Sequence, residues 1–111
     1  MKLRITIAAL VILLLAAIVL TATVKTRTEI TGTGAAVQVA SSGSALWVQV
    51  VADPGNSSPV RLGDSTVTAT SGVRVAPGGG QMLPYKGDFY TLSSIYVYVA
   101  NGDKVSVIWS D

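Results

Sequence analysis

The sequence lacks cysteine and histidine and contains few charged residues, and each absence removes a class of chemistry. Without cysteine there is no disulfide, no thiolate zinc site and no cysteine nucleophile. Without histidine there is no Ser-His-Asp triad, no imidazole metal site and no unperturbed side chain that titrates near neutral pH. Only 13% of the residues are charged, whereas 50% are hydrophobic. The composition therefore predicts a non-enzymatic protein that needs no cofactor and no metal.

The hydrophobic residues are concentrated near the N-terminus. Residues 5–24 read ITIAALVILLLAAIVLTATV and contain no charge. A helix of this length extends roughly 30 Å, which matches the hydrocarbon core of a bilayer. Basic residues stand on both sides of the run. We therefore expect residues 1–27 to form a transmembrane helix with basic flanks. The apolar side chains that would contact lipid include Ile5, Leu10, Leu13, Leu14, Leu15, Ile18 and Leu20.

Two other interpretations of this run are open. A buried core helix is disfavoured, because the rest of the chain could not cover a helix that is apolar on every face. A cleaved signal peptide is the stronger alternative, since MKLR resembles the basic region that begins such peptides. However, the run is longer than their usual apolar region, and Leu20 stands where cleavage prefers a small residue. We favour a retained anchor in a lipid bilayer, with a short cytoplasmic or interior N-terminus.

After residue 27 the pattern changes from helix to strand. The Thr/Gly-rich start of residues 28–45 predicts a stalk or a first strand. Residues 46–111 alternate β-branched with small polar residues, which predicts a small antiparallel β-sandwich or barrel. Asn101-Gly102 favours a hairpin turn between the last two strands. The expected fold class is therefore mainly β behind one transmembrane helix. The strands are expected at 35–40, 46–52, 59–62, 66–70, 73–75, 95–100 and 105–109.

The residues that could carry chemistry favour structural roles. Asp53, Asp64, Asp88 and Asp103 each stand beside Gly or Pro, which is typical of aspartates that cap turns. Residues 78–80 are three glycines without the lysine or the helix of a phosphate-binding loop. From residue 28 to 111 there are four basic and six acidic residues, a net charge of −2. This charge argues against a nucleic-acid partner, which would need a basic stripe.

Aromatic residues provide the candidate binding site. A small sandwich cannot bury all of them, and tyrosine and tryptophan are enriched in protein interfaces. A stacking platform for carbohydrate or single-stranded nucleic acid is the weaker alternative, because basic residues do not cluster with these aromatics. We expect the interface to include Trp47, Tyr85, Tyr90, Tyr96, Tyr98 and Trp109.

A faint pattern in residues 46–110 is similar to a known family. A V-x-L-G strand is followed by Val-Thr, a glycine, an apolar residue and Pro-Gly, and two strands close the domain. The matching positions are Val60, Leu62, Gly63, Val67, Thr68, Gly72, Val75, Pro77 and Gly78. This arrangement resembles a small β-domain of bacteriophage virion proteins. The resemblance implies a structural or accessory role and supplies no catalytic residues.

These observations together predict a minor structural protein of a bacteriophage that has a membrane inside its capsid. The helix would sit in that internal membrane, or in the host membrane during assembly. The β-domain would bind capsid or other virion proteins as a homo-oligomer or on their lattice, because avidity strengthens repeated weak contacts. The alternative is an exported or single-pass cell-envelope protein, or a pilin-like filament subunit with a β-sandwich head.

Overall fold

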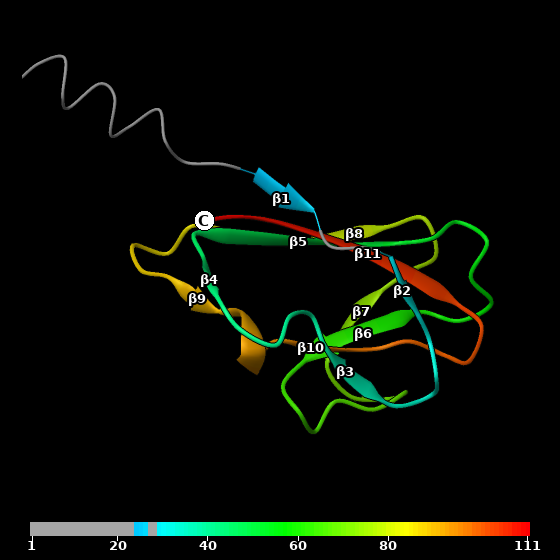
Figure 1. Cartoon of the computed structure of the whole chain (residues 1–111). Helices are drawn as coiled ribbons and strands as arrows, with labels where there is room; N and C mark the ends of the chain where they lie inside the picture. The colour runs from blue at the N-terminus through cyan, green and yellow to red at the C-terminus, as the bar shows by residue number, and fades with distance from the viewer. Residues whose placement is uncertain (1–23, 27–28) are drawn as a thin grey trace, which may run out of the picture.

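The computed structural model of the chain describes residues 24–26 and 29–111, which form a β-rich domain with antiparallel sheets (Figure 1). Sheet A has the strand order β1-β11-β5-β8, and β2 also pairs with β11. Its strands are β1 (Val24–Thr26), β2 (Ile30–Thr31), β5 (Trp47–Ala52), β8 (Gly80–Leu83) and β11 (Lys104–Ser110). The predicted mainly antiparallel β-structure is thus confirmed.

Sheet B has the order β3-β10-β6-β7, and a small sheet C pairs β4 with β9. The strands of sheet B are β3 (Ala36–Gln38), β6 (Val60–Gly63), β7 (Val73–Val75) and β10 (Tyr96–Tyr98). Sheet C consists of β4 (Ser44–Ala45) and β9 (Tyr90–Thr91), and a one-turn 3-10 helix, η1 (Leu92–Ser94), follows β9. Sheet C lies at one end of the space between sheets A and B (Figure 1).

Sheets A and B pack against each other across one hydrophobic core. Side chains alternate between the two faces of a strand, so β-branched residues at every second position cover one face. On β5 and β11 the core face carries wholly buried valines, and Val50 lies opposite Val107. The buried cluster consists of Ile30, Val39, Ala45, Val48, Val50, Ala52, Val60, Leu62, Val75, Leu92, Ile95, Val97, Val99, Val105 and Val107.

The fold class predicted from the sequence is wrong in its transmembrane helix. Across residues 24–26 and 29–111, no helix is long and apolar enough to cross a membrane. Val24 and Lys25, expected at the end of the helix and in its basic flank, lie instead in β1. Their partners on β11 are Ser110 and Trp109. The pairing is favoured because β1 gains the backbone hydrogen bonds of a sheet edge, and Lys25 Nζ lies 3.2 Å from an Asp111 carboxylate oxygen.

The remaining predicted anchor residues lie outside the described part of the chain. They are Ile5, Leu10, Leu13, Leu14, Leu15, Ile18 and Leu20.

The predicted hairpin between the last two strands is also wrong, although its turn forms. The Asp103 N–H donates to the Ala100 carbonyl oxygen at 2.9 Å, and Gly102 has a φ of 85°. A glycine with positive φ at this third position is typical of a type II turn. However, β10 pairs with β3 and β6 in sheet B, whereas β11 lies in sheet A. The turn therefore carries the chain from one sheet to the other.

Residues 66–70, predicted as a strand, form a loop because their polar side chains bind the backbone. The Thr66 N–H donates to the Asp64 carboxylate at 2.9 Å. The Thr68 N–H donates to the Ser71 hydroxyl, also at 2.9 Å. Such local hydrogen bonds offer the backbone an alternative to a sheet ladder.

Candidate functional site

The two tryptophans of the predicted interface lie on neighbouring strands but face opposite sides of sheet A. Trp109 on β11 pairs with Val48, and Trp47 on β5 pairs with Ser110. Since Trp109 shares its face with Val107, it lies on the core side of the sheet and packs against the buried cluster. Trp47 lies on the outer side. The two indole rings therefore belong to different surfaces.

The four tyrosines are also distributed over separate surfaces. Tyr96 and Tyr98 flank the buried Val97 on β10, so they lie half-buried on the outer face of sheet B. Tyr85, 64% exposed, lies in the loop that follows β8. Tyr90 has a structural role, because its hydroxyl donates to the Pro84 carbonyl oxygen at 2.7 Å. The six predicted residues thus do not form one continuous interface.

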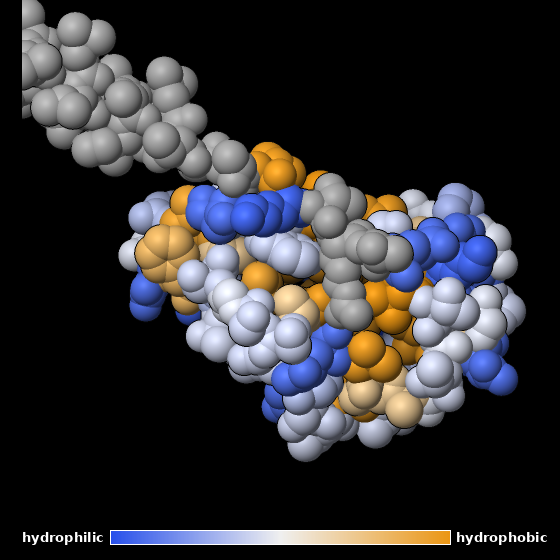
Figure 2. Space-filling model, viewed as in Figure 1, coloured by the Kyte–Doolittle hydropathy of each residue, from blue (hydrophilic) through white to orange (hydrophobic). Residues whose placement is uncertain are grey.

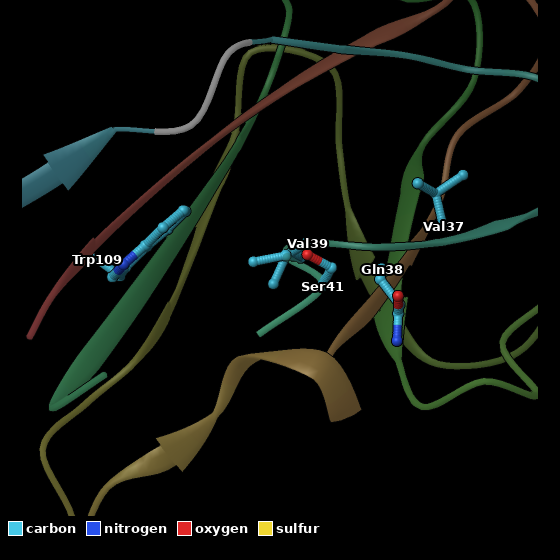
Figure 3. Close-up of a pocket in the computed structure, with 6 residues that line it drawn as sticks. Val37, Gln38, Val39, Ser41 and Trp109 are labelled. Carbon is cyan, nitrogen blue, oxygen red and sulfur yellow. The ribbon is translucent and has the colours of Figure 1, made fainter. Parts of the chain in front are cut away.

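A cleft of about 450 Å³ lies between Trp109 and the chain that leaves β3 (Figure 3). It is lined by Val37, Gln38, Val39, Ala40, Ser41 and Trp109. In Figure 3 the side chain of Val39 points toward Trp109. The cleft opens between the two sheets, where hydrophobic residues reach the surface in the view of Figure 2.

Hydrogen bonds hold the two walls of the cleft in place. On one wall the Val39 N–H donates to the Ile95 carbonyl oxygen at 3.0 Å, and the Gln38 amide donates to the Ser93 carbonyl oxygen at 2.9 Å. These bonds fix the end of β3 against η1 and the start of β10. The Trp109 wall is fixed because β11 is paired on both sides, with β1 and with β5.

The chemistry of the cleft suits binding rather than catalysis. Among the described residues, its lining combines apolar side chains with one amide and one hydroxyl and includes no titratable side chain. Ligand-binding pockets commonly have volumes of roughly 300–1,000 Å³, with mostly apolar walls and a few polar groups. The cleft can therefore accept an apolar side chain of a partner, with polar atoms at its rim. Sequence reasoning identified Trp109 but missed residues 37–41, whose strand-like alternation gave no sign of a binding site.

Carboxylates act as structural acceptors in the described residues. The Asp103 carboxylate is largely buried and accepts the N–H groups of Ser57 and Ser58, both at 3.0 Å, and the Ser57 hydroxyl at 3.1 Å. The bond from the Ser57 backbone is the main reason that the pKa of Asp103 lies below its ordinary value. Over residues 24–26 and 29–111, Asp and Glu side chains nowhere gather in a group that could hold a metal ion.

Asp64 is a second aspartate that stabilises a turn. Hydrogen bonds from Thr66, first from its hydroxyl and then from its N–H, lower the pKa of the Asp64 carboxyl. Asp53 likewise accepts the Gly55 N–H at 2.7 Å, and Asp88 accepts the Phe89 N–H at 2.7 Å. The predicted turn-capping role of these aspartates agrees with these contacts.

Comparison with family models, with curated proteins and with solved structures finds no match to this chain.

Proposed function

We propose that the protein is a structural, non-enzymatic component of a larger protein assembly, and that it binds a partner protein at the cleft beside Trp109. The observation that carries this proposal is a half-buried indole at the edge of the core, facing an open cleft of about 450 Å³. Tryptophan side chains in such settings are enriched among the residues that dominate the binding energy of protein interfaces. The apolar character of the lining within the described part of the chain further supports binding over catalysis.

The assembly that we propose is a virion, with capsid or another virion protein as the partner. Support for this comes from the resemblance of residues 46–110 to a β-domain of bacteriophage virion proteins. A shallow cleft supplies modest affinity, which suits a protein present in many copies on a lattice. Repeated weak contacts then add through avidity.

The experiment compares purified virions that carry the wild-type chain, Trp109→Ala or Trp47→Ala. Trp47 is the matched control because it is the same residue type on the neighbouring strand but faces away from the cleft. Quantitative mass spectrometry of the particles should find fewer copies of Trp109→Ala than of wild type, and unchanged copies of Trp47→Ala. Equal loss of both variants, or loss of neither, would contradict binding at the cleft.

A second variant separates binding from folding, since Trp109 also packs against the core. Ser41 is exposed at the rim, so Ser41→Lys should block the cleft while leaving the thermal melting temperature close to that of wild type. Loss of Ser41→Lys from the particles supports the cleft. Recovery of the wild-type chain in the cell-envelope fraction alone, and not in particles, would overturn the virion assignment.

A further inference from the structure

The outer face of sheet B carries two arginines directly opposite each other. Arg61 on β6 pairs with Arg74 on β7. Their neighbours Val60 and Val75 are buried in the core, and alternation therefore directs both arginines to the outer face. Residues opposite each other in antiparallel strands have Cβ atoms about 4.5–5.5 Å apart, a separation at which like charges destabilise the sheet.

Tyr98 extends this pair into a row across three strands. It lies opposite Arg61 on the other side of β6, and its neighbours Val97 and Val99 are buried. Tyr98 therefore faces outward beside Arg61. We call these three residues, Tyr98, Arg61 and Arg74, the arginine row.

Within the described residues, neither arginine of the row forms an ion pair with a carboxylate. Between described residues, ion pairs join Lys25 to Asp111 and Lys104 to Glu29, and both involve strands or flanks of sheet A. Asp64, which follows β6 in sequence, accepts the Thr66 N–H and hydroxyl at Oδ1, and within the described residues it forms no ion pair with Arg61 or Arg74.

The Arg61 guanidinium is already oriented by the loop beside it. Its Nε donates to the Ala69 carbonyl oxygen at 3.2 Å, and its Nη1 donates to the Gly72 carbonyl oxygen at 3.5 Å. A guanidinium has five N–H donors, so these two bonds leave others for a ligand. Because part of its rotamer freedom is already lost, Arg61 gives up less entropy when it binds an acceptor.

We propose that the arginine row binds an acidic segment of a partner protein, with neighbouring carboxylates paired to Arg61 and Arg74. The planar fork of a guanidinium matches the two oxygens of a carboxylate, and such a ligand would remove the repulsion between the two cations. Tyr98 would pack beside the acidic segment, as tyrosine does at protein interfaces. This surface lies on the opposite sheet from Trp109, so the proposal goes beyond binding at the cleft.

A protein ligand is favoured over nucleic acid by the distribution of charge. Residues 28–111 carry a net charge of −2. A nucleic-acid site neutralises many phosphates with a longer basic surface, whereas this row contains two arginines. Two cations side by side suit a short pair of acidic side chains.

The test is a binding titration of the full-length chain, in neutral detergent, with a fluorescently labelled oligoglutamate peptide. Fluorescence anisotropy should detect binding that weakens as salt is added. Oligoglutamine of the same length, as a control, should not bind. Arg74→Gln should weaken binding by about tenfold or more, since it removes one charge-assisted pair. Arg74→Lys should fall between wild type and Arg74→Gln, because lysine keeps the charge but loses the fork.

A matched cation on sheet A supplies the specificity control. Lys104 is about half exposed and lies 3.8 Å from Glu29, so Lys104→Gln removes the same charge from the other sheet and should leave peptide binding unchanged. Equal weakening by Lys104→Gln and Arg74→Gln would overturn the proposal, as would equal binding of the glutamine peptide. Tighter binding of a labelled oligothymidine than of oligoglutamate would overturn it in favour of nucleic acid. Failure here leaves the Trp109 cleft untouched, because none of these variants lines it.

Discussion

Asn56 and Lys104 are joined by a pair of hydrogen bonds in which a side-chain amide takes the place of a neighbouring strand. Asn56 Nδ2 donates to the Lys104 carbonyl oxygen, and the Lys104 N–H donates to Asn56 Oδ1, both at 2.8 Å. Asn56 itself closes the turn after β5, where its N–H donates to the Asp53 carbonyl oxygen at 3.1 Å. The pair therefore ties this turn to the first residue of β11.

Removing this amide should destabilise the domain. Asn56→Ala leaves the Lys104 N–H without its acceptor, although the Lys104 carbonyl oxygen still accepts the Asp53 N–H at 3.1 Å. We expect a loss of about 1–3 kcal/mol in the free energy of unfolding. Urea denaturation of the full-length chain, followed by tryptophan fluorescence, measures the change. Asn101→Ala is the matched control, because Asn101 is exposed in a turn, and it should cost less than about 0.5 kcal/mol. Similar losses for the two variants would contradict a special role for the Asn56 pair.

Stability should fall in acid because of Asp103. Its pKa in the folded state lies below the ordinary value of 3.8, so the unfolded chain binds this proton more readily. Asp103 therefore contributes its full stabilisation when the pH is above the ordinary pKa. This stabilisation is lost as the pH falls through the lowered pKa of the folded state. Thermal melts between pH 7 and pH 2 should show a smaller acid-induced decrease for Asp103→Asn than for wild type. Identical pH profiles for the two chains would contradict the assignment, since Asp64 contributes equally to both.

Two glycines should differ sharply in their tolerance of a side chain. A Cβ at Gly32 would overlap the carbonyl oxygens of Val99 and Ala100, whereas a Cβ at Gly102 meets nothing within 4 Å. Gly102→Ala should therefore cost only the strain of its positive φ, about 1–2 kcal/mol. Gly32→Ala should cost more, about 3 kcal/mol or greater, because backbone atoms must move. Melting temperatures rank the two variants, and the reverse order would show that the backbone of Val99 and Ala100 can move away from position 32 at little cost.

Adjacent valines on β5 test which side of sheet A is the core. Val50 is wholly buried, while Val51 is 38% exposed on the outer face. Val50→Ala removes two buried methyl groups and leaves a cavity, so it should cost about 2–3 kcal/mol. Val51→Ala should cost less than about 1 kcal/mol. Equal costs, measured by urea denaturation, would indicate that a partner or a second copy covers the outer face.

Local sequence patterns predicted many of the strands. They did not predict strands that form only because a distant segment pairs with them. The runs at 46–52 and 105–109 are rich in β-branched residues, and a turn signal lies near each, at Asp53-Pro54 and at Asn101-Gly102, so both signals are local. They are confirmed as β5 and β11. The strands β8 and β9 were missed, because β8 begins in a run of glycines and β9 has only two residues. Such segments become strands through the neighbours they pair with.

The candidate site was predicted less well because its composition depends on which sheet each strand joins. The sequence predicts that Trp47 and Trp109 lie in strands. It does not predict that Trp109 lies on the core side of sheet A and Trp47 on the outer side. The Asn101-Gly102 turn was identified correctly, yet nothing in its residues indicates that it connects two sheets. The sequence also gives no sign that Arg61 and Arg74 are neighbours, because only the register of β6 and β7 brings them together.

The central position of β11 has a consequence for the order in which the domain can fold. This strand pairs with β1, β2 and β5. Sheet A is therefore complete only when Trp109, near the end of the chain, pairs with Lys25. Loop closure over such a sequence separation is slow, and folding rates fall as native contacts become less local. During synthesis, the core-facing side chains of β2 and β5, such as Ile30 and Val50, stay uncovered until β11 has left the ribosome. The nascent domain is therefore an expected client of chaperones that shield hydrophobic strands until the last one arrives.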